Sequence, residues 1–278
     1  TPGFTLSKTD HPTNPPDPAT VARLASERAA RQQAEQASQQ AAHERAASEA
    51  ALLWQAASDT GQSAYLERKG VKPYGVRFAA DGCILVPLID AFGKLWNVQR
   101  IAPHKPANGG TDKLFLKGGR KSGLFHWCGD PAGADALLIC EGYATGASLH
   151  ECTGRPVAVA FDAGNLAAVA KAIHQAHPAA LIVLCGDDDL QTFAEKGFNP
   201  GRDKATAAAR TVAGLSVFPE GLPAGGSDFN DLHQAAGYDA VALIVNHAID
   251  TFEPPQTAAQ STQAAKPGNR ANTRQNKA

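Results

Sequence analysis

Carboxylate side chains follow three apolar segments, each about as long as a β-strand. Glu141 comes directly after ALLIC, the run Asp187–Asp189 follows ALIVLCG, and Asp228 stands in SDFNDL, shortly after LSVFP. Bringing carboxylates together costs electrostatic repulsion and desolvation unless a cation compensates. Hard oxygen ligands of this kind suit Mg²⁺ or Mn²⁺. The three acidic clusters together therefore predict a divalent-metal site.

Each cluster also has a simpler interpretation. An acidic residue at the first position of a helix is an ordinary N-cap, and Asp228 is well placed to cap a helix that begins near Phe229. Asp162, in AFDAGN, is interpreted as such a cap and not as a metal ligand. The functional interpretation is favoured for Glu141 together with Asp187 and Asp189.

The elements that would position these residues alternate between strands and helices. From Ala134 onward, short apolar runs are followed by helical segments, a rhythm typical of a buried parallel sheet covered by helices. Active sites of such α/β sheets lie just beyond the carboxyl ends of the strands. Upstream, CILVPLID and KLWNVQRI flank the turn residues 91–93 and predict an antiparallel hairpin.

The amino-terminal part of the chain is rich in Ala, Gln, Glu and Arg, with neither Gly nor Pro between residues 19 and 57, which predicts one or two long helices. A solvated helix packed by its alanines is the simpler interpretation, and an arm that contacts nucleic acid or a partner protein is the alternative. The expected units are a disordered tail at 1–18, a helical arm at 19–60, a smaller α+β subdomain at 61–133, an α/β catalytic domain at 134–252 and a second disordered tail at 253–278.

Composition limits the partners that the chain can attract. Its formal net charge is only -1, so any surface for nucleic acid must be local. One segment, residues 104–123, meets this condition with one acidic residue against five basic ones: Lys105, Lys113, Lys117, Arg120 and Lys121. The five cysteines form no CxxC pair, which excludes a zinc ribbon, and Cys140 and Cys185 are expected to be buried free thiols.

Targeting signals are not evident in the sequence. With no apolar signal core and no apolar run long enough to cross a membrane, a soluble cytoplasmic protein is expected. The complete lack of methionine indicates either loss of the initiator residue or a piece of a longer protein.

Residues 134 to about 235 resemble the Toprim domain. ICEGYATG resembles its strand followed by Glu-Gly, VLCGDDD resembles its Asp-x-Asp motif, and SDFNDL resembles the third acidic element of primases. The resemblance implies that Asp187, Asp189 and Asp228 hold Mg²⁺ or Mn²⁺, and that Glu141 completes the metal shell or acts as general base. Gly142 and Gly146 fit a tight turn between strand and helix.

The segment upstream resembles the amino-terminal half of the bacterial replicative primase core. This likeness is carried by YLERKGV, the hairpin and DKLFLKGG. The residues of the motifs from ICEGYATG onward are most similar to those of primases of conjugative plasmids and related mobile elements. The implied activity is RNA primer synthesis on single-stranded DNA from ribonucleoside triphosphates. Arg100, Lys113 and Lys117 would then contact nucleotide or template phosphates, and the amino-terminal helix would bind replication or conjugation proteins.

Three features differ from the replicative enzyme. The chain has no Cys/His zinc motif ahead of its core, the loop between Lys113 and Gly123 is shorter, and the segment after Asp189, LQTFAEKGFNPGRDK, is longer. Two alternatives stay open: a Toprim nuclease or other phosphoryl-transfer enzyme, and a non-catalytic module that binds single-stranded DNA.

Overall fold

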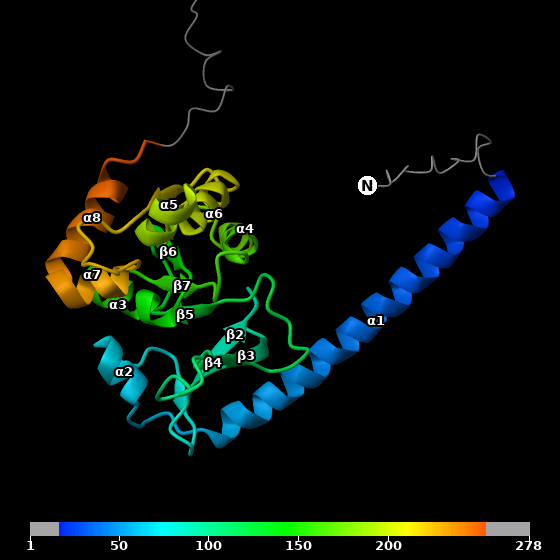
Figure 1. Cartoon of the computed structure of the whole chain (residues 1–278), viewed down its shortest axis with the longest axis horizontal. Coiled ribbons are helices and arrows are strands. Elements are labelled where there is room, and N and C mark those ends of the chain that lie inside the picture. The colour runs from blue at the N-terminus through cyan, green and yellow to red at the C-terminus, as the bar shows by residue number, and fades with distance from the viewer. Residues whose placement is uncertain (1–16, 254–278) are drawn as a thin grey trace, which may run out of the picture.

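The computed structural model describes residues 17–253, so the two predicted tails lie almost wholly outside the described residues. The first element is a single helix, α1 (Pro18–Ala56), whose N-cap Asp17 accepts a hydrogen bond from the Thr20 amide at 3.3 Å. Every residue from 21 to 41 is exposed, and the buried residues Ala46, Ala47 and Ala50 lie in the last turns. Those last turns pack against strand β3 (Leu95–Ile101), and the rest of the helix projects away from the body (Figure 1).

A short helix and an antiparallel sheet follow. Helix α2 (Ala64–Lys69) ends at Gly70, and the strands run in the order β1-β2-β3-β4, where β1 is Arg77–Phe78, β2 is Ile84–Ile89 and β4 is Lys113–Phe115. The predicted β2–β3 hairpin is confirmed. Asp90 fixes its turn by accepting backbone hydrogen bonds from Phe92 at 2.9 Å and Lys94 at 3.0 Å.

The second sheet has five strands in the order β5-β7-β6-β8-β9. Its strands are β5 (His126–Cys128), β6 (Ala136–Cys140), β7 (Val157–Val159), β8 (Leu181–Cys185) and β9 (Leu215–Val217). All pairs are parallel except that of β5 with β7, so the predicted α/β class with a mostly parallel sheet is confirmed. Strand β5 lies upstream of residue 134 and yet belongs to this sheet, while a bridge between Ile89 and Phe125 joins the two sheets.

Helices cover both faces of the five-stranded sheet (Figure 1). One face carries α3 (Tyr143–Thr153), α7 (Phe229–Ala236) and α8 (Tyr238–Asp250); the other carries α4 (Leu166–Ala176) and α6 (Pro200–Arg210), while the short α5 (Leu190–Lys196) follows β8. Alternate strand residues supply the two cores, with Leu138 and Val183 on the first face and Ile139 and Leu184 on the second.

Cys140 and Cys185 are buried free thiols, as predicted. Between residues 17 and 253 there is no helix with the length and apolar character that crossing a membrane requires.

Candidate active site

The acidic site is built at the carboxyl ends of two neighbouring strands. Glu141 directly follows β6 and Asp187 follows β8 by two residues, and these strands are parallel neighbours in which Ile139 pairs with Leu184. Because parallel strands end at the same edge of a sheet, both carboxylates lie at one edge of the sheet, a cluster that we call the acidic crevice. The third carboxylate, Asp228, reaches it from the start of α7.

The electrostatics of Asp187 show how close these groups are. Burial raises the pKa of Asp187 to about 8, and the negative charges of Glu141 and Asp228 act in the same direction. Lys113 opposes this shift of the Asp187 pKa but does not cancel it. A buried aspartate among other carboxylates thus favours its protonated form unless a further cation is supplied.

The pKa of Glu141 is also raised. Burial is the main cause that raises its pKa, the charge of Asp162 adds to this, and Lys204 opposes it. One oxygen of each carboxylate, Oε1 of Glu141 and Oδ1 of Asp187, is buried without a hydrogen-bond partner. Buried polar atoms are usually paired, so these two carboxylate oxygens are the atoms of the site most available to a cation.

Asp228 has a second role, as its alternative interpretation predicted. It is the N-cap of α7, where its Oδ1 accepts a hydrogen bond from the Asp231 amide at 2.9 Å. Its Oδ2 accepts one from the Thr145 hydroxyl of α3 at 3.0 Å. Asp228 is therefore held rigidly at the crevice by two elements.

The two aspartates after Asp187 do not share its surroundings. Asp188 is buried, accepts a hydrogen bond from Asn199 Nδ2 at 2.7 Å and pairs with Arg202 Nε at 3.1 Å. Asp189, a predicted metal ligand, is the N-cap of α5 and accepts hydrogen bonds from the amide and hydroxyl of Thr192 at 3.0 and 2.5 Å. These bonds lower the pKa of Asp189, which is half-buried. The structure therefore places Asp187 alone of the three in the crevice.

The predicted basic residues are also separated. Lys113 lies beside Asp187 and Asp228, and burial is the main cause that lowers its pKa. Arg100 points the other way, because Lys113 pairs in register with Ile101 and successive strand residues face opposite sides of a sheet. Its guanidinium forms an ion pair with Asp81. Lys117 is exposed in the loop after β4.

Glycine contacts add one residue that sequence reasoning missed. A Cβ on Gly201 would lie 2.6 Å from the carbonyl oxygen of Asp187, so α6 approaches the backbone of Asp187 as only glycine allows. Gly146, expected in the turn, lies inside α3, and its Cβ would meet Val159 Cγ2 of β7 at 2.6 Å. The lack of a side chain at Gly146 therefore allows α3 to pack closely against β7. It does not open the backbone to a phosphate.

Other residues near the site were assigned no role from the sequence, although their segment, YLERKGV, carries the resemblance to the primase core. Tyr65, Arg68 and Lys69 of α2 are far from the crevice in sequence, but Lys69 Nζ lies 3.9 Å from Asp231 Oδ1 and the charge of Asp228 contributes to the raised pKa of Tyr65, after burial and Asp112. The packing of α2 against α7 brings them there, and Asn230 Nδ2 of α7 donates a hydrogen bond of 2.8 Å to the Lys69 carbonyl.

The donor set fits a divalent cation in its chemistry, because carboxylate oxygens with unpaired lone pairs are what Mg²⁺ and Mn²⁺ prefer. Within residues 17–253, however, no three His, Cys, Asp or Glu side chains are close enough together to hold a metal ion as they stand. The crevice would have to contract around one.

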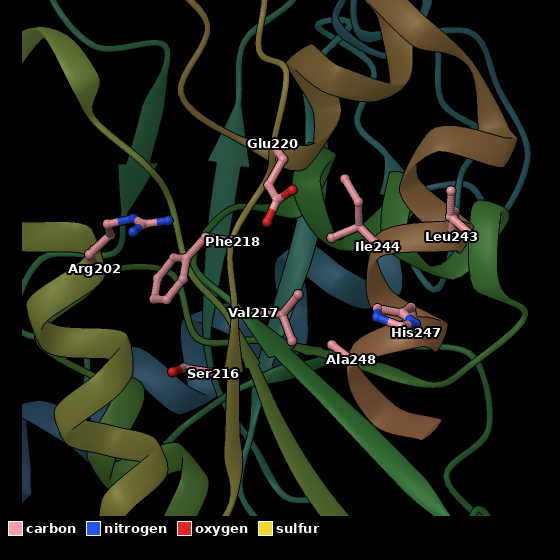
Figure 2. Close-up of a pocket in the computed structure, with 9 residues that line it drawn as sticks. All are labelled: Arg202, Ser216, Val217, Phe218, Glu220, Leu243, Ile244, His247 and Ala248. Atoms are coloured by element: carbon pink, nitrogen blue, oxygen red, sulfur yellow. The ribbon is translucent and has the colours of Figure 1, made fainter. Parts of the chain in front are cut away.

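A separate cavity of about 540 Å³ lies at the edge strand β9, between α6 and α8 (Figure 2). Val217, Ile244 and Ala248 supply apolar side chains to its wall, and Arg202 and Glu220 are its charged residues. It contains none of the clustered carboxylates, so it is not the candidate active site.

Comparison with known proteins agrees with the position of the crevice. Residues 136–239 match the family model described as Toprim domain. The chain carries a Toprim domain. This domain spans β6, β8 and the start of α7, and it therefore contains Glu141, Asp187 and Asp228. A Toprim domain points in general to the use of a divalent metal ion.

Two curated relatives, both named DNA primase TraC of Escherichia coli, extend the likeness beyond the Toprim domain. One is 40% identical over 209 residues, which are 73% of this chain and 19% of the relative. The other is 43% identical over 165 residues, 58% of this chain and 11% of the relative. The chain thus spans about a fifth or less of the length of either relative.

Solved structures of primases are similar to parts of the chain. The DnaG primase catalytic domain bound to ssDNA is 16% identical and covers 76% of this chain and 80% of its own, with a TM-score of 0.49. The E. coli primase catalytic core is 17% identical and covers 66% of this chain and 72% of its own, with a TM-score of 0.46.

Proposed function

We propose that this chain is the catalytic segment of a DNA primase of the type encoded by conjugative plasmids. It would make RNA primers on single-stranded DNA from ribonucleoside triphosphates by metal-dependent nucleotidyl transfer, in the cytoplasm. The observation that carries this proposal is the pair of buried, unpaired carboxylate oxygens on Glu141 and Asp187 beside Lys113, inside a Toprim domain. The similarity to DNA primase TraC selects this reaction among those of Toprim enzymes.

Asp187 and Asp228 are the proposed metal ligands. Bound Mg²⁺ or Mn²⁺ would offset the charge of the triphosphate and of the leaving pyrophosphate. Asp228 is included because its charge acts on Asp187, and each of its oxygens accepts only one hydrogen bond and keeps a lone pair for the ion. Asp189 caps α5 in the same way, but no carboxylate of the site acts on its pKa, so we assign it no ligand role in this arrangement.

Glu141 and Lys113 are the proposed groups that act on the reactants. The raised pKa of Glu141 suits it to take the proton from the attacking 3′-hydroxyl. The Lys113 ammonium, half-buried near Asp187 and Asp228, would bind a phosphate oxygen as a point charge. Arg100 and Lys117 would meet template phosphates further out, and for Arg100 this requires release from Asp81.

One experiment tests the proposal. The protein is incubated with single-stranded DNA, labelled ribonucleotides and Mg²⁺ or Mn²⁺, and short RNA is sought on a denaturing gel. RNA that disappears in Asp187→Ala and Glu141→Ala supports a primase. Template cleavage without synthesis would instead identify a Toprim nuclease, and binding without either reaction would identify a non-catalytic module for single-stranded DNA.

A further inference from the structure

Helix α6 carries a lysine, Lys204, close to the acidic crevice. The amino-terminal end of α6 lies against Asp187, since a Cβ on Gly201 would be 2.6 Å from the Asp187 carbonyl oxygen. Lys204 follows Gly201 by three residues, a spacing that makes two residues neighbours on the surface of a helix. Lys204 is therefore about one helical turn from the contact of α6 with Asp187.

The direction in which Lys204 points follows from its neighbour Arg202. The Arg202 Cζ atom lies 4.3 Å from the ring centroid of Phe218, which directly follows the edge strand β9 (Figure 2). Residues two apart on an α-helix point about 200° away from each other. Because the strand order is β6-β8-β9 and α6 packs on β8, Lys204 points away from β9 and toward the end of β6, where Glu141 stands.

The charges around Lys204 agree with this direction. Its positive charge lowers the pKa of Glu141, against burial and Asp162, the larger causes, which raise it. Within residues 17–253 Lys204 takes part in no ion pair, and no acidic residue stands three or four positions from it on α6. The exposed Lys204 side chain is thus available to an anion that enters the crevice.

The acidic crevice therefore has a lysine on each face of the sheet. Lys113 lies near Asp228, which begins α7 on one face, whereas Lys204 belongs to α6 on the other. In nucleotidyl transfer the attacking and leaving oxygens lie roughly in line, on opposite sides of the phosphorus. The triphosphate belongs to the side of Lys113, so the hydroxyl whose proton Glu141 takes lies on the side of Lys204.

We propose that Lys204 binds a backbone phosphate of the RNA strand that supplies the attacking 3′-hydroxyl. This inference rests on the proposed function, since it assigns a contact to the growing strand of that reaction. Lysine suits the task because its ammonium is a point charge on a flexible stem, and each phosphate of a growing strand must be released in turn. Lys113 and Lys204 would thus serve different reactants.

The test compares two fluorescent ligands, a DNA strand of about 20 nucleotides and the same strand annealed to an RNA of about 10 nucleotides. Binding is followed by fluorescence anisotropy between about 50 and 200 mM KCl, at constant Mg²⁺ and without nucleotides, so that no RNA is made. Loss of one contact between lysine and phosphate lowers the slope of log K against log salt by about 1. Lys204→Gln should therefore lower the slope by about 1 for the RNA-primed strand and leave the slope for DNA alone unchanged.

Three further variants serve as controls. Lys204→Arg keeps the charge and should keep the slope of the parent protein. Arg210→Gln removes one charge from an exposed position on the same helix, about 9 Å along its axis, and should leave both slopes unchanged. Lys113→Gln should weaken binding of a fluorescent ATP analogue, which Lys204→Gln should not affect. Thermal melting checks that each variant is folded.

An unchanged slope for the RNA-primed strand in folded Lys204→Gln would overturn the inference, as would an equal fall for DNA alone or in Arg210→Gln. Weaker binding of the ATP analogue to Lys204→Gln would also overturn it, because that result assigns Lys204 to the triphosphate. Binding requires no synthesis, so the outcome is independent of the proposed function. A protein that loses slope in Lys204→Gln but makes no RNA keeps this contact and loses the primase assignment.

Discussion

Asp187 and the two aspartates that follow it are adjacent in sequence but differ in their partners. Asp187 is half-buried beside Glu141, and its Oδ1 is buried without a hydrogen-bond partner. Asp188 is buried and paired with Asn199 and Arg202, and the half-buried Asp189 caps α5. A paired carboxylate indicates a structural role, whereas a buried oxygen without a partner indicates a group that can bind a cation.

The largest expected effect separates Asp187 from Asp189 in catalysis. Asp187→Asn should lower primer synthesis by about 100-fold or more, because the metal-binding charge is lost while the shape is kept. Asp189→Asn should change it by less than about threefold, since asparagine is an equally good N-cap. Initial rates of primer formation measure both. Equal losses in the two variants would show that Asp189 leaves its cap to bind metal.

The close approach of Gly201 to the Asp187 carbonyl allows a second test of the special role of Asp187. In Gly201→Ala the new Cβ would meet the Asp187 carbonyl, so the backbone must move and displace the carboxylate. We expect primer synthesis to fall by about 10- to 100-fold.

The matched control is Ala207→Gly, at an exposed position of the same helix. It weakens α6 by about 1 kcal/mol without touching Asp187 and should leave the rate nearly unchanged. A similar loss of rate in both variants would assign the effect to α6 as a whole.

Stability should respond to Asp188 and not to Asp189. Asp188→Ala leaves Asn199 and the partly exposed Arg202 without their partner, so the free energy of unfolding should fall by about 2–3 kcal/mol. Asp189→Asn should change it by less than about 0.5 kcal/mol. Urea denaturation of both variants measures this difference, and equal values would remove the structural distinction between the two residues.

The smallest effect concerns the pH dependence of stability without metal. The pKa of Asp187 is about 8 in the fold and near 4 in the unfolded chain, so the protonated carboxyl favours folding at low pH. That contribution is lost as pH rises from about 4 to 8. Asp187→Asn, which stays neutral, should therefore exceed the parent protein in stability by roughly 1–3 kcal/mol at pH 9 in EDTA.

At pH 4 the same substitution should have almost no effect, and saturating Mg²⁺ should reduce the difference at pH 9. Thermal melts of both proteins across this range measure it. A constant difference at all pH values would show that Asp187 does not titrate as its surroundings require.

The sequence predicted the long helix, the hairpin, the parallel sheet and the position of Glu141 and Asp187 beyond strand ends of that sheet, because strand length, helix composition and strand ends are local properties. It could not separate Asp187 from Asp189, since the direction of each side chain depends on α5 and its cap at Thr192. The strand pairing that turns Arg100 away from Lys113 is equally non-local. Arg68 and Lys69 were assigned no role because only the packing of α2 against α7 brings them to the crevice.

The long helix α1 has a mechanical consequence. Residues 21–41 are exposed throughout, and at 1.5 Å per residue they extend about 30 Å beyond the turns that Ala46 and Ala50 anchor to β3. The Lys94–Glu44 ion pair, 3.2 Å long, adds a fixed point near that anchor. Helix α1 would therefore hold a protein bound at its first turns away from the catalytic crevice, and the length of the helix would set the distance between them.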